Sequence, residues 1–192
     1  HYRARRQRQM CIRDRAVMAH RGGSLEAPEN TIESFKYALE IGSDIIETDI
    51  QLSSDGIPYI FHDDDLKRIP GIGKNFNELL ASEIDELNIF DDYKIPTLEE
   101  TLKQFPNTKF QIDFKTDEVV DPAIEIINKL PHIKKNLCVA SFSSQRLQKI
   151  KSKLSDVTYS MGPHEVLKLL LKSFGIYSCL LYTSDAADEL CS

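Results

Sequence analysis

Short apolar segments alternate with amphipathic segments along most of the chain. The apolar segments have the length and alternation of strands, and they lie at residues 16–20, 44–52, 57–63, 109–115, 136–142 and 157–161. Most segments between them repeat apolar residues at intervals of three and four, which predicts helices at residues 29–42, 77–87, 97–105, 121–130, 143–154 and 164–174. This alternation predicts a parallel sheet covered by helices, either a doubly wound sheet or an eight-stranded barrel.

The clearest of the predicted helices lies within the segment from Glu29 to Gly42. Asn30 is its expected N-cap, and Gly42 lies just beyond its expected C-terminus. Its apolar face consists of Ile32, Phe35, Ala38 and Leu39. Six strands in roughly 160 residues make about two-thirds of a barrel, which takes about 250 residues. We therefore predict an α/β fold, a TIM-type (β/α) barrel that is truncated after about six strand–helix units.

The two ends of the chain do not belong to this pattern. DNA that encodes CLLYTSDAADE, residues 179–189, also encodes RRQRQMCIRD, residues 5–14, when its opposite strand is read one base out of frame. Ends encoded by complementary strands are what one DNA adapter leaves on both sides of a DNA fragment. We therefore expect residues 1–15 and 179–192 to be non-native tails and residues 16–178 to be a partial barrel.

Setting the tails aside makes the remaining chain more acidic. The whole chain has a formal charge of −6, of which the first tail contributes six Arg and one Asp and the second tail three acidic residues, so the body carries −8. Such a charge leaves no basic surface for a polyanion and argues against a nucleic-acid partner. A small anionic substrate would need local positive charge, such as a metal ion.

The remaining bulk features exclude several classes of protein. No apolar run reaches the roughly 18 residues that a bilayer span requires, so we expect no transmembrane segment. We expect a cytoplasmic location, with secretion or periplasmic export still open. Only Cys138 lies outside the tails, in an apolar run, which predicts a buried free thiol and no disulfide or zinc site. No sequence feature indicates an oligomeric state.

Polar side chains gather at the ends of the first four predicted strands. These residues are His20 and Arg21, Glu47 and Asp49, His62 and Asp63, and Asp113 and Lys115. In barrel enzymes the carboxyl ends of the strands form the rim that carries the active site. The pattern therefore predicts that these side chains meet at one rim.

The carboxylates are candidates for metal ligands. Glu47 and Asp49 share one face of a strand, because alternate residues of a strand point the same way, and two carboxylates so placed repel unless a cation lies between them. A hard divalent ion prefers such oxygen ligands. Asp113 adds a third carboxylate, and Lys115 adds a positive charge on the same face. The alternative is an edge strand with a solvated polar face.

The two histidines are candidates for acid–base catalysis. His20 and His62 each end a predicted strand, and an ordinary imidazole exists in both protonation states near neutral pH. One could therefore act as base and the other as acid across a phosphodiester. The alternative for each is a structural role in hydrogen bonding. We expect His132 and His164, which lack acidic neighbours of this kind, to be surface residues.

The segment from Ala19 to Lys74, AHRGGSLEAPENTIESFKYALEIGSDIIETDIQLSSDGIPYIFHDDDLKRIPGIGK, resembles the opening of the glycerophosphodiester phosphodiesterase family. The family motifs H-R-G, P-E-N-T, E-x-D, D-G-x-P and H-D occur in order, followed by I-P-T-L-E-E and a strand that ends at Lys115. A weaker similarity extends to about Phe174. Two departures are Asp113, where the family more often has Glu, and Ile69–Pro70, which replaces a usual Thr.

This resemblance implies a role for each residue of the rim. His20 and His62 would be the acid–base pair, and Glu47, Asp49 and Asp113 would bind one divalent ion, Mg²⁺ or Ca²⁺. Arg21 and Lys115 would bind the phosphate, with Glu29 and Asn30 near the substrate mouth. The implied reaction cleaves a small-molecule glycerophosphodiester to glycerol 3-phosphate and an alcohol. In the family a substrate hydroxyl can act as nucleophile and give a cyclic phosphate that water then opens.

Two other functions fit the same residues. A phospholipase D-like enzyme acting on lysophospholipid or sphingolipid headgroups would use the same rim, but the loop from Asp63 to Lys94 has no long insertion, which favours small diesters. A non-catalytic barrel that only binds metal is the second alternative. The presence of both His20 and His62 argues against it.

Overall fold

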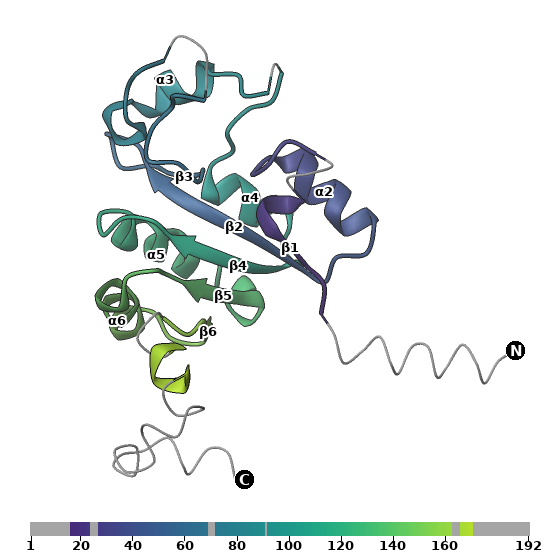
Figure 1. The fold of residues 1–192 in the computed structure, drawn as a ribbon, viewed down its shortest axis with the longest axis vertical. Coiled ribbons are helices and arrows are strands. Elements are labelled where there is room, and N and C mark those ends of the chain that lie inside the picture. Colours follow the sequence, from purple (N-terminus) through teal and green to yellow (C-terminus); the bar gives the residue numbers. More distant parts are fainter. Residues whose placement is uncertain (1–15, 24–26, 69–71, 91, 163–165, 171–192) are drawn as a thin grey trace, which may run out of the picture.

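The computed structural model describes residues 16–23, 27–68, 72–90, 92–162 and 166–170, and both predicted tails lie outside this part of the chain. Six strands form one sheet: β1 (Met18–Ala19), β2 (Ile45–Leu52), β3 (Pro58–Ile60), β4 (Lys109–Phe114), β5 (Leu137–Ala140) and β6 (Thr158–Tyr159). Five of them are parallel neighbours in the order β1-β2-β4-β5-β6 (Figure 1). The described sheet is open, with β1 and β6 at its ends, as expected for a truncated TIM-type barrel.

The helices lie along the sheet in the order the sequence predicts (Figure 1). They are α2 (Ile32–Glu40), α3 (Ala81–Glu86), α4 (Leu98–Gln104), α5 (Val120–Lys129) and α6 (Ser144–Lys153). Three 3₁₀ turns accompany them, η1 (His20–Gly22), η2 (Phe76–Glu78) and η3 (Pro131–Asn136). Of the helix predicted at residues 164–174, the described residues 166–170 are helical. No helix in the described chain is long and apolar enough to cross a membrane.

The third predicted strand has a different place from the one expected. β3 pairs with β2 in the antiparallel sense, with Ile50 opposite Ile60 and Leu52 opposite Pro58. Only five residues separate the two strands, whereas a parallel crossover needs a dozen or more. A strand therefore forms within the predicted residues 57–63, but it is antiparallel to β2, and five of the six described strands are parallel neighbours.

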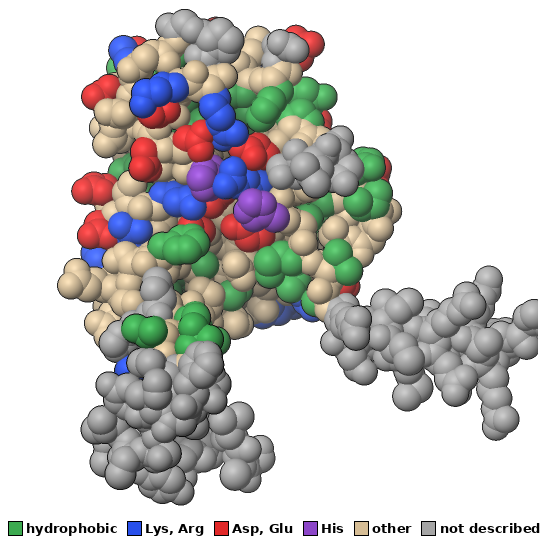
Figure 2. Space-filling view, in the orientation of Figure 1, with side chains coloured by type: hydrophobic (Ala, Val, Ile, Leu, Met, Phe, Trp, Pro, Cys, Tyr) green, Lys and Arg blue, Asp and Glu red, His purple; other side chains and the backbone are tan. Residues whose placement is uncertain are grey.

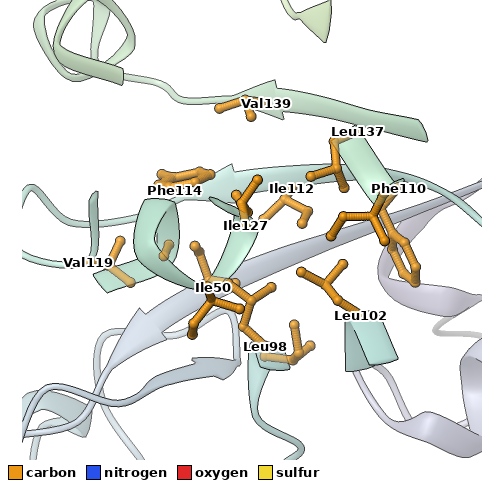
Figure 3. Close-up of a cluster of buried hydrophobic side chains, with 14 of the residues drawn as sticks. Ile50, Leu98, Leu102, Phe110, Ile112, Phe114, Val119, Ile127, Leu137 and Val139 are labelled. Carbon is orange, nitrogen blue, oxygen red and sulfur yellow. The ribbon is translucent and has the colours of Figure 1, made fainter. Parts of the chain in front are cut away.

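The two faces of the sheet differ sharply in chemistry. One face of β2, β4 and β5 carries apolar side chains such as Ile50, Ile112 and Val139, which pack with Leu98 of α4 and Ile127 of α5 in a continuous core (Figure 3). Because side chains alternate along a strand, the intervening residues point to the opposite face. They include five polar residues, which are Glu47, Asp49, Gln51, Gln111 and Asp113. One set of alternate residues therefore forms the core between the sheet and the helices. The other set, on the opposite face of the sheet, is available for a site.

A second, smaller core follows β3. Tyr59, Phe61, Leu66 and Phe76 are buried in it, and the rings of Phe61 and Phe76 stack with their centroids 4.8 Å apart. This core holds the loop that starts at Phe61. His62 belongs to no strand, but it directly follows Phe61, which is buried in this core.

The start of α2 differs by one residue from the prediction. Thr31, not Asn30, is the N-cap, because the Thr31 hydroxyl accepts a hydrogen bond from the Ser34 amide at 3.1 Å while the Ser34 hydroxyl accepts one from the Thr31 amide at 3.2 Å. Asn30 has a left-handed backbone with φ 57°. Its side chain is therefore free of the capping role and turns to the sheet.

Candidate active site

A cavity of about 670 Å³ lies over the polar face of the sheet at the carboxyl ends of the strands. All seven residues predicted to bind metal, carry out acid–base catalysis or hold the phosphate line it: His20, Arg21, Glu47, Asp49, His62, Asp113 and Lys115. Figure 2 shows basic, acidic and histidine side chains gathered on this face, with hydrophobic side chains beside them. The two residues predicted near the mouth, Glu29 and Asn30, contact this set without lining the cavity.

Strand register brings the carboxylates together. In the parallel pairing of β2 with β4, Glu47 lies beside Gln111 and Asp49 lies beside Asp113. The three acidic residues are buried. Burial, and then the charge of Asp49, raises the pKa of Glu47 above its ordinary value. The sheet thus concentrates negative charge that favours a bound cation.

Lys115 supplies one such cation. Its Nζ donates to Asp49 Oδ1 at 2.8 Å and to Asp113 Oδ2 at 2.7 Å. Burial alone would lower the Lys115 pKa, but the hydrogen bonds to Asp113 and Asp49 outweigh it and raise the pKa. The other oxygen of Asp113, Oδ1, is buried and has no hydrogen-bond partner. Asp113 Oδ1 is therefore a buried carboxylate oxygen without a hydrogen-bond donor among the described residues.

The turn η1 follows β1 and places His20 and Arg21 beside Glu47 of β2. Arg21 has φ 51° and Gly22 has φ 76°, so the chain reverses in a left-handed turn, and the Arg21 amide donates to Glu47 Oε2 at 3.0 Å. His20 Nε2 lies 3.8 Å from the same Glu47 oxygen. A side chain at Gly22 would collide with Ser34 and Phe35 of α2. Glycine is required there because the turn packs directly on the helix.

The guanidinium of Arg21 is held from two sides. Its Nη1 donates to Glu29 Oε2 at 3.1 Å and Oε1 at 3.3 Å, and its Nε lies 3.7 Å from Asp49 Oδ2. Asn30 Nδ2 donates to the same Asp49 oxygen at 3.2 Å, and its Oδ1 accepts from Thr48 at 2.8 Å. Arg21 Nε itself makes no hydrogen bond in the described structure. This nitrogen is buried, and the Asp49 carboxylate is its ion-pair partner.

His62 lies at the cavity in the loop after an antiparallel strand, an arrangement that the pattern of apolar residues did not predict. It follows the antiparallel strand β3, and the amide of the preceding residue, Phe61, donates to the Asp49 carbonyl at 3.0 Å. Gln51 fixes the next residues, because its Nε2 donates to the carbonyl of Asp63 at 3.2 Å and to Asp64 Oδ1 at 2.9 Å. His62 Nδ1 lies 2.6 Å from Asp63 Oδ1. Among the described residues no hydrogen bond involves the other ring nitrogen of His62, Nε2.

Several residues of the site escaped the sequence prediction. Gln51 had a usable signal, because it lies two residues after Asp49 on the same face of β2. Phe142 lines the cavity and is 81% exposed, and the centroid of its ring lies 5.6 Å from Lys115 Nζ. Strand alternation gave no such signal for Phe142. Of the other histidines, His132 is exposed on η3 as expected, and His164 lies outside the described residues.

The fold and the cavity define the class of protein. It is a barrel-type α/β protein whose rim cavity combines buried carboxylates with two histidines and two cationic side chains. A sequence model of the Glycerophosphoryl diester phosphodiesterase family matches residues 20–170. The chain belongs to this family.

Known proteins with similar chains include two human enzymes. The chain is 33% identical to Glycerophosphodiester phosphodiesterase 1 from Homo sapiens over 159 residues, covering 76% of this chain and 48% of the relative. It is 34% identical to Lysophospholipase D GDPD1 from Homo sapiens over 116 residues, covering 54% of this chain and 37% of the relative. The chain thus spans about half of these relatives or less.

A solved structure is similar over a larger share of its length. The structure of an Oleispira antarctica phosphodiesterase in complex with the product sn-glycerol-3-phosphate superposes with a TM-score of 0.69. The two chains are 28% identical, and the match covers 81% of this chain and 72% of the other.

Proposed function

We propose that this chain carries the catalytic rim of a metal-dependent phosphodiester hydrolase that cleaves glycerophosphodiesters to glycerol 3-phosphate and an alcohol. The observation that carries the proposal is the single cavity that contains two histidines, two cations and three buried carboxylates. Membership of the family supports it, as does the product bound to the Oleispira antarctica relative.

Arg21 and Lys115 are the proposed phosphate-binding residues. The side chains of Arg21 and Lys115 both line the cavity, and their positive charges suit non-bridging phosphate oxygens. Glu29 holds Arg21 in place through Nη1. Donors fixed in this way stabilise the charge that develops on the phosphoryl group without having to reorganise.

The acidic residues fit one divalent ion by their chemistry. Glu47, Asp49 and Asp113 offer only oxygen ligands, which Mg²⁺ and Ca²⁺ prefer, and Asp113 Oδ1 has no other partner. In the described structure the ammonium of Lys115 bridges Asp49 and Asp113, and no group of three His, Cys, Asp or Glu residues is arranged as a metal site. When bound, the ion would act as a Lewis acid on a phosphoryl oxygen. Lys115 would then exchange a carboxylate for the phosphate.

His20 and His62 supply the proposed base and acid. The side chain of His20 is 67% exposed, and that of His62 is half as exposed and held by Asp63. One imidazole accepts the proton of the attacking hydroxyl, and the other donates a proton to the departing alcohol. The two groups leave the reaction with their protons exchanged, so water must restore them before the next turnover.

A lipid substrate is the second candidate. Phe142 and Met161 are exposed apolar residues in the lining of the cavity, with Met18 and Val166 beside them. An acyl chain could pack on this wall while the headgroup phosphate lies at the rim. The name of the human relative Lysophospholipase D GDPD1 supports this alternative. Parallel assays on glycerophosphocholine and a lysophosphatidylcholine separate the two substrates.

The decisive test is hydrolysis of glycerophosphocholine by the complete parent protein, with Mg²⁺, Ca²⁺ or EDTA. We expect His20→Ala and His62→Ala each to lower kcat by about 10²–10⁴-fold. His132→Ala is the matched control, because His132 lies exposed on η3 away from the cavity, and it should retain activity. Activity that survives both EDTA and the His20 and His62 substitutions would refute the proposal.

A further inference from the structure

Arg68 joins two parts of the site that are remote in sequence. Its Nε donates to Asp63 Oδ2 at 2.5 Å, and its Nη2 donates to Glu29 Oε1 at 2.6 Å. The second oxygen of Asp63 contacts His62, and both oxygens of Glu29 accept from Arg21. A chain of charged hydrogen bonds therefore runs from one proposed catalytic histidine to one proposed phosphate ligand.

We propose that Arg68 is a positioning residue that sets His62 through Asp63 and Arg21 through Glu29. The inference rests on the proposed function, since it assigns a role within that reaction. Arg68 itself is absent from the lining of the cavity. Its effect must therefore pass through the two carboxylates that it holds.

The geometry differs from that of an ordinary surface ion pair. The side chain of Arg68 is 51% exposed, but its two partners are largely covered, Glu29 more than Asp63. A guanidinium presents its donors in a rigid planar fork, so two separate carboxylates can be fixed at once. A Lys ammonium is a point charge on a flexible stem and cannot hold both in that geometry.

Electrostatics support the same assignment. Burial alone would raise the pKa of Asp63, but the hydrogen bond with His62 and the charge of Arg68 outweigh it and lower the pKa. Asp63 therefore stays ionised and keeps its hold on His62 Nδ1. Without Arg68, nothing in the described structure holds Asp63 Oδ2, and Glu29 has Arg21 as its one remaining ion-pair partner.

Loss of this tie should alter orientation more than folding. Two mobile carboxylates would let the imidazole and the guanidinium turn away from the substrate, and a displacement of about 1 Å can cost about 10²-fold in rate. Because Arg21 binds substrate and His62 acts on it, both kinetic constants should change. We expect Arg68→Met to lower kcat by about 10–100-fold and to raise KM by several-fold.

The test uses the complete parent protein, glycerophosphocholine and saturating Mg²⁺. Arg68→Met is compared with Lys67→Met, a neighbour that is 76% exposed and pairs only with Asp65 among the described residues. Lys67→Met should leave kcat and KM unchanged, and Arg68→Lys should recover only part of the loss. Melting temperatures of the three variants should agree within a few degrees.

A double-mutant cycle provides the readout that a merely structural role would not move. In a protein that already carries Glu29→Gln and Asp63→Asn, Arg68→Met should have little further effect, because its two partners have lost their charge. An equal loss in both backgrounds, or an Arg68→Met variant that behaves like Lys67→Met, would overturn the inference alone. An inactive parent protein would overturn the proposed function and this inference with it.

Discussion

Removal of the Lys115 ammonium tests how the acidic cluster is balanced. In Lys115→Met the side chain keeps its length and loses its charge, so Asp113 loses its ion-pair partner in the described structure and Asp49 keeps only Arg21 Nε, at 3.7 Å. Lys115 is 16% exposed and the two carboxylates are more deeply covered. Removing one partner of a buried ion pair costs about 3–5 kcal/mol, and the partial exposure of Lys115 puts the cost at this site at about 3 kcal/mol. In a domain of this size that loss lowers Tm by about 6–12 °C.

The assay is thermal unfolding of the complete parent protein in EDTA and again with Mg²⁺ or Ca²⁺. In EDTA, Lys115→Met should melt well below the wild type. Lys67→Met is the control, because its pair with Asp65 is exposed and contributes at most about 1 kcal/mol. A divalent ion should raise the Tm of Lys115→Met more than that of the wild type, because the ion no longer competes with an ammonium for Asp49 and Asp113.

Two results would refute this reasoning. If Lys115→Met melts with Lys67→Met in EDTA, the carboxylates do not depend on the ammonium for their charge balance. If the ion raises the Tm of wild type and Lys115→Met equally, the ion does not bind between Asp49 and Asp113. An ion at about 100 times its Kd stabilises the folded state by about 2.7 kcal/mol, which a melting curve detects easily.

Two further predictions concern Glu47 and Gly22. Because burial and then Asp49 raise the pKa of Glu47, its protonated form stabilises the metal-free protein fully below its ordinary value of 4.5, and that contribution is lost as pH rises through the folded pKa. Glu47→Gln should flatten this fall in unfolding curves recorded in EDTA, and an unchanged slope would contradict the burial argument. Gly22→Ala should cost about 2–4 kcal/mol, because φ is +76° and the new methyl meets Ser34 and Phe35. Gly56→Ala, with φ +88° and no atom within 4 Å, should cost about 1 kcal/mol, and equal losses for the two variants would show that packing at Gly22 does not matter.

The fold could be predicted where local patterns and burial agree. β2 and β4 lie inside the sheet, and their alternation of apolar and polar residues, strict in β4 and broken at Ile45 and Thr48 in β2, reflects one face on the core and one face on the cavity. The helix at α2 was equally clear, but its first residue was not, since Asn30 and Thr31 are both good caps. Which residue caps the helix depends on Thr48 and Asp49 of β2, because both form hydrogen bonds with the Asn30 side chain.

The direction of β3 could have been deduced from the length of the connection between β2 and β3. Its apolar residues resemble those of the barrel strands, so the pattern of side chains does not distinguish the two arrangements. The connection from Leu52 to Pro58 does, because five residues allow a hairpin and exclude a crossover. Loop length carries information about topology that periodicity does not.

The grouping of the three proposed metal ligands was predictable because it follows from the geometry of the strands. Glu47 and Asp49 share a face by alternation, and parallel pairing with β4 then puts Asp113 at the level of Asp49. Arg68 acts from a loop, and its contact with Glu29 spans 39 residues of sequence. No local pattern encodes such a contact.

The position of His62 shows how the two kinds of information combine. Its motif marked it as a catalytic candidate, but its place at the rim depends on the hairpin, on the Phe61 amide bound to the Asp49 carbonyl, and on Gln51. Each of these contacts begins from β2, the strand that also carries Glu47 and Asp49. One strand, β2, therefore fixes the position of the histidine relative to Glu47 and Asp49, and a change in the register of β2 would move all three together.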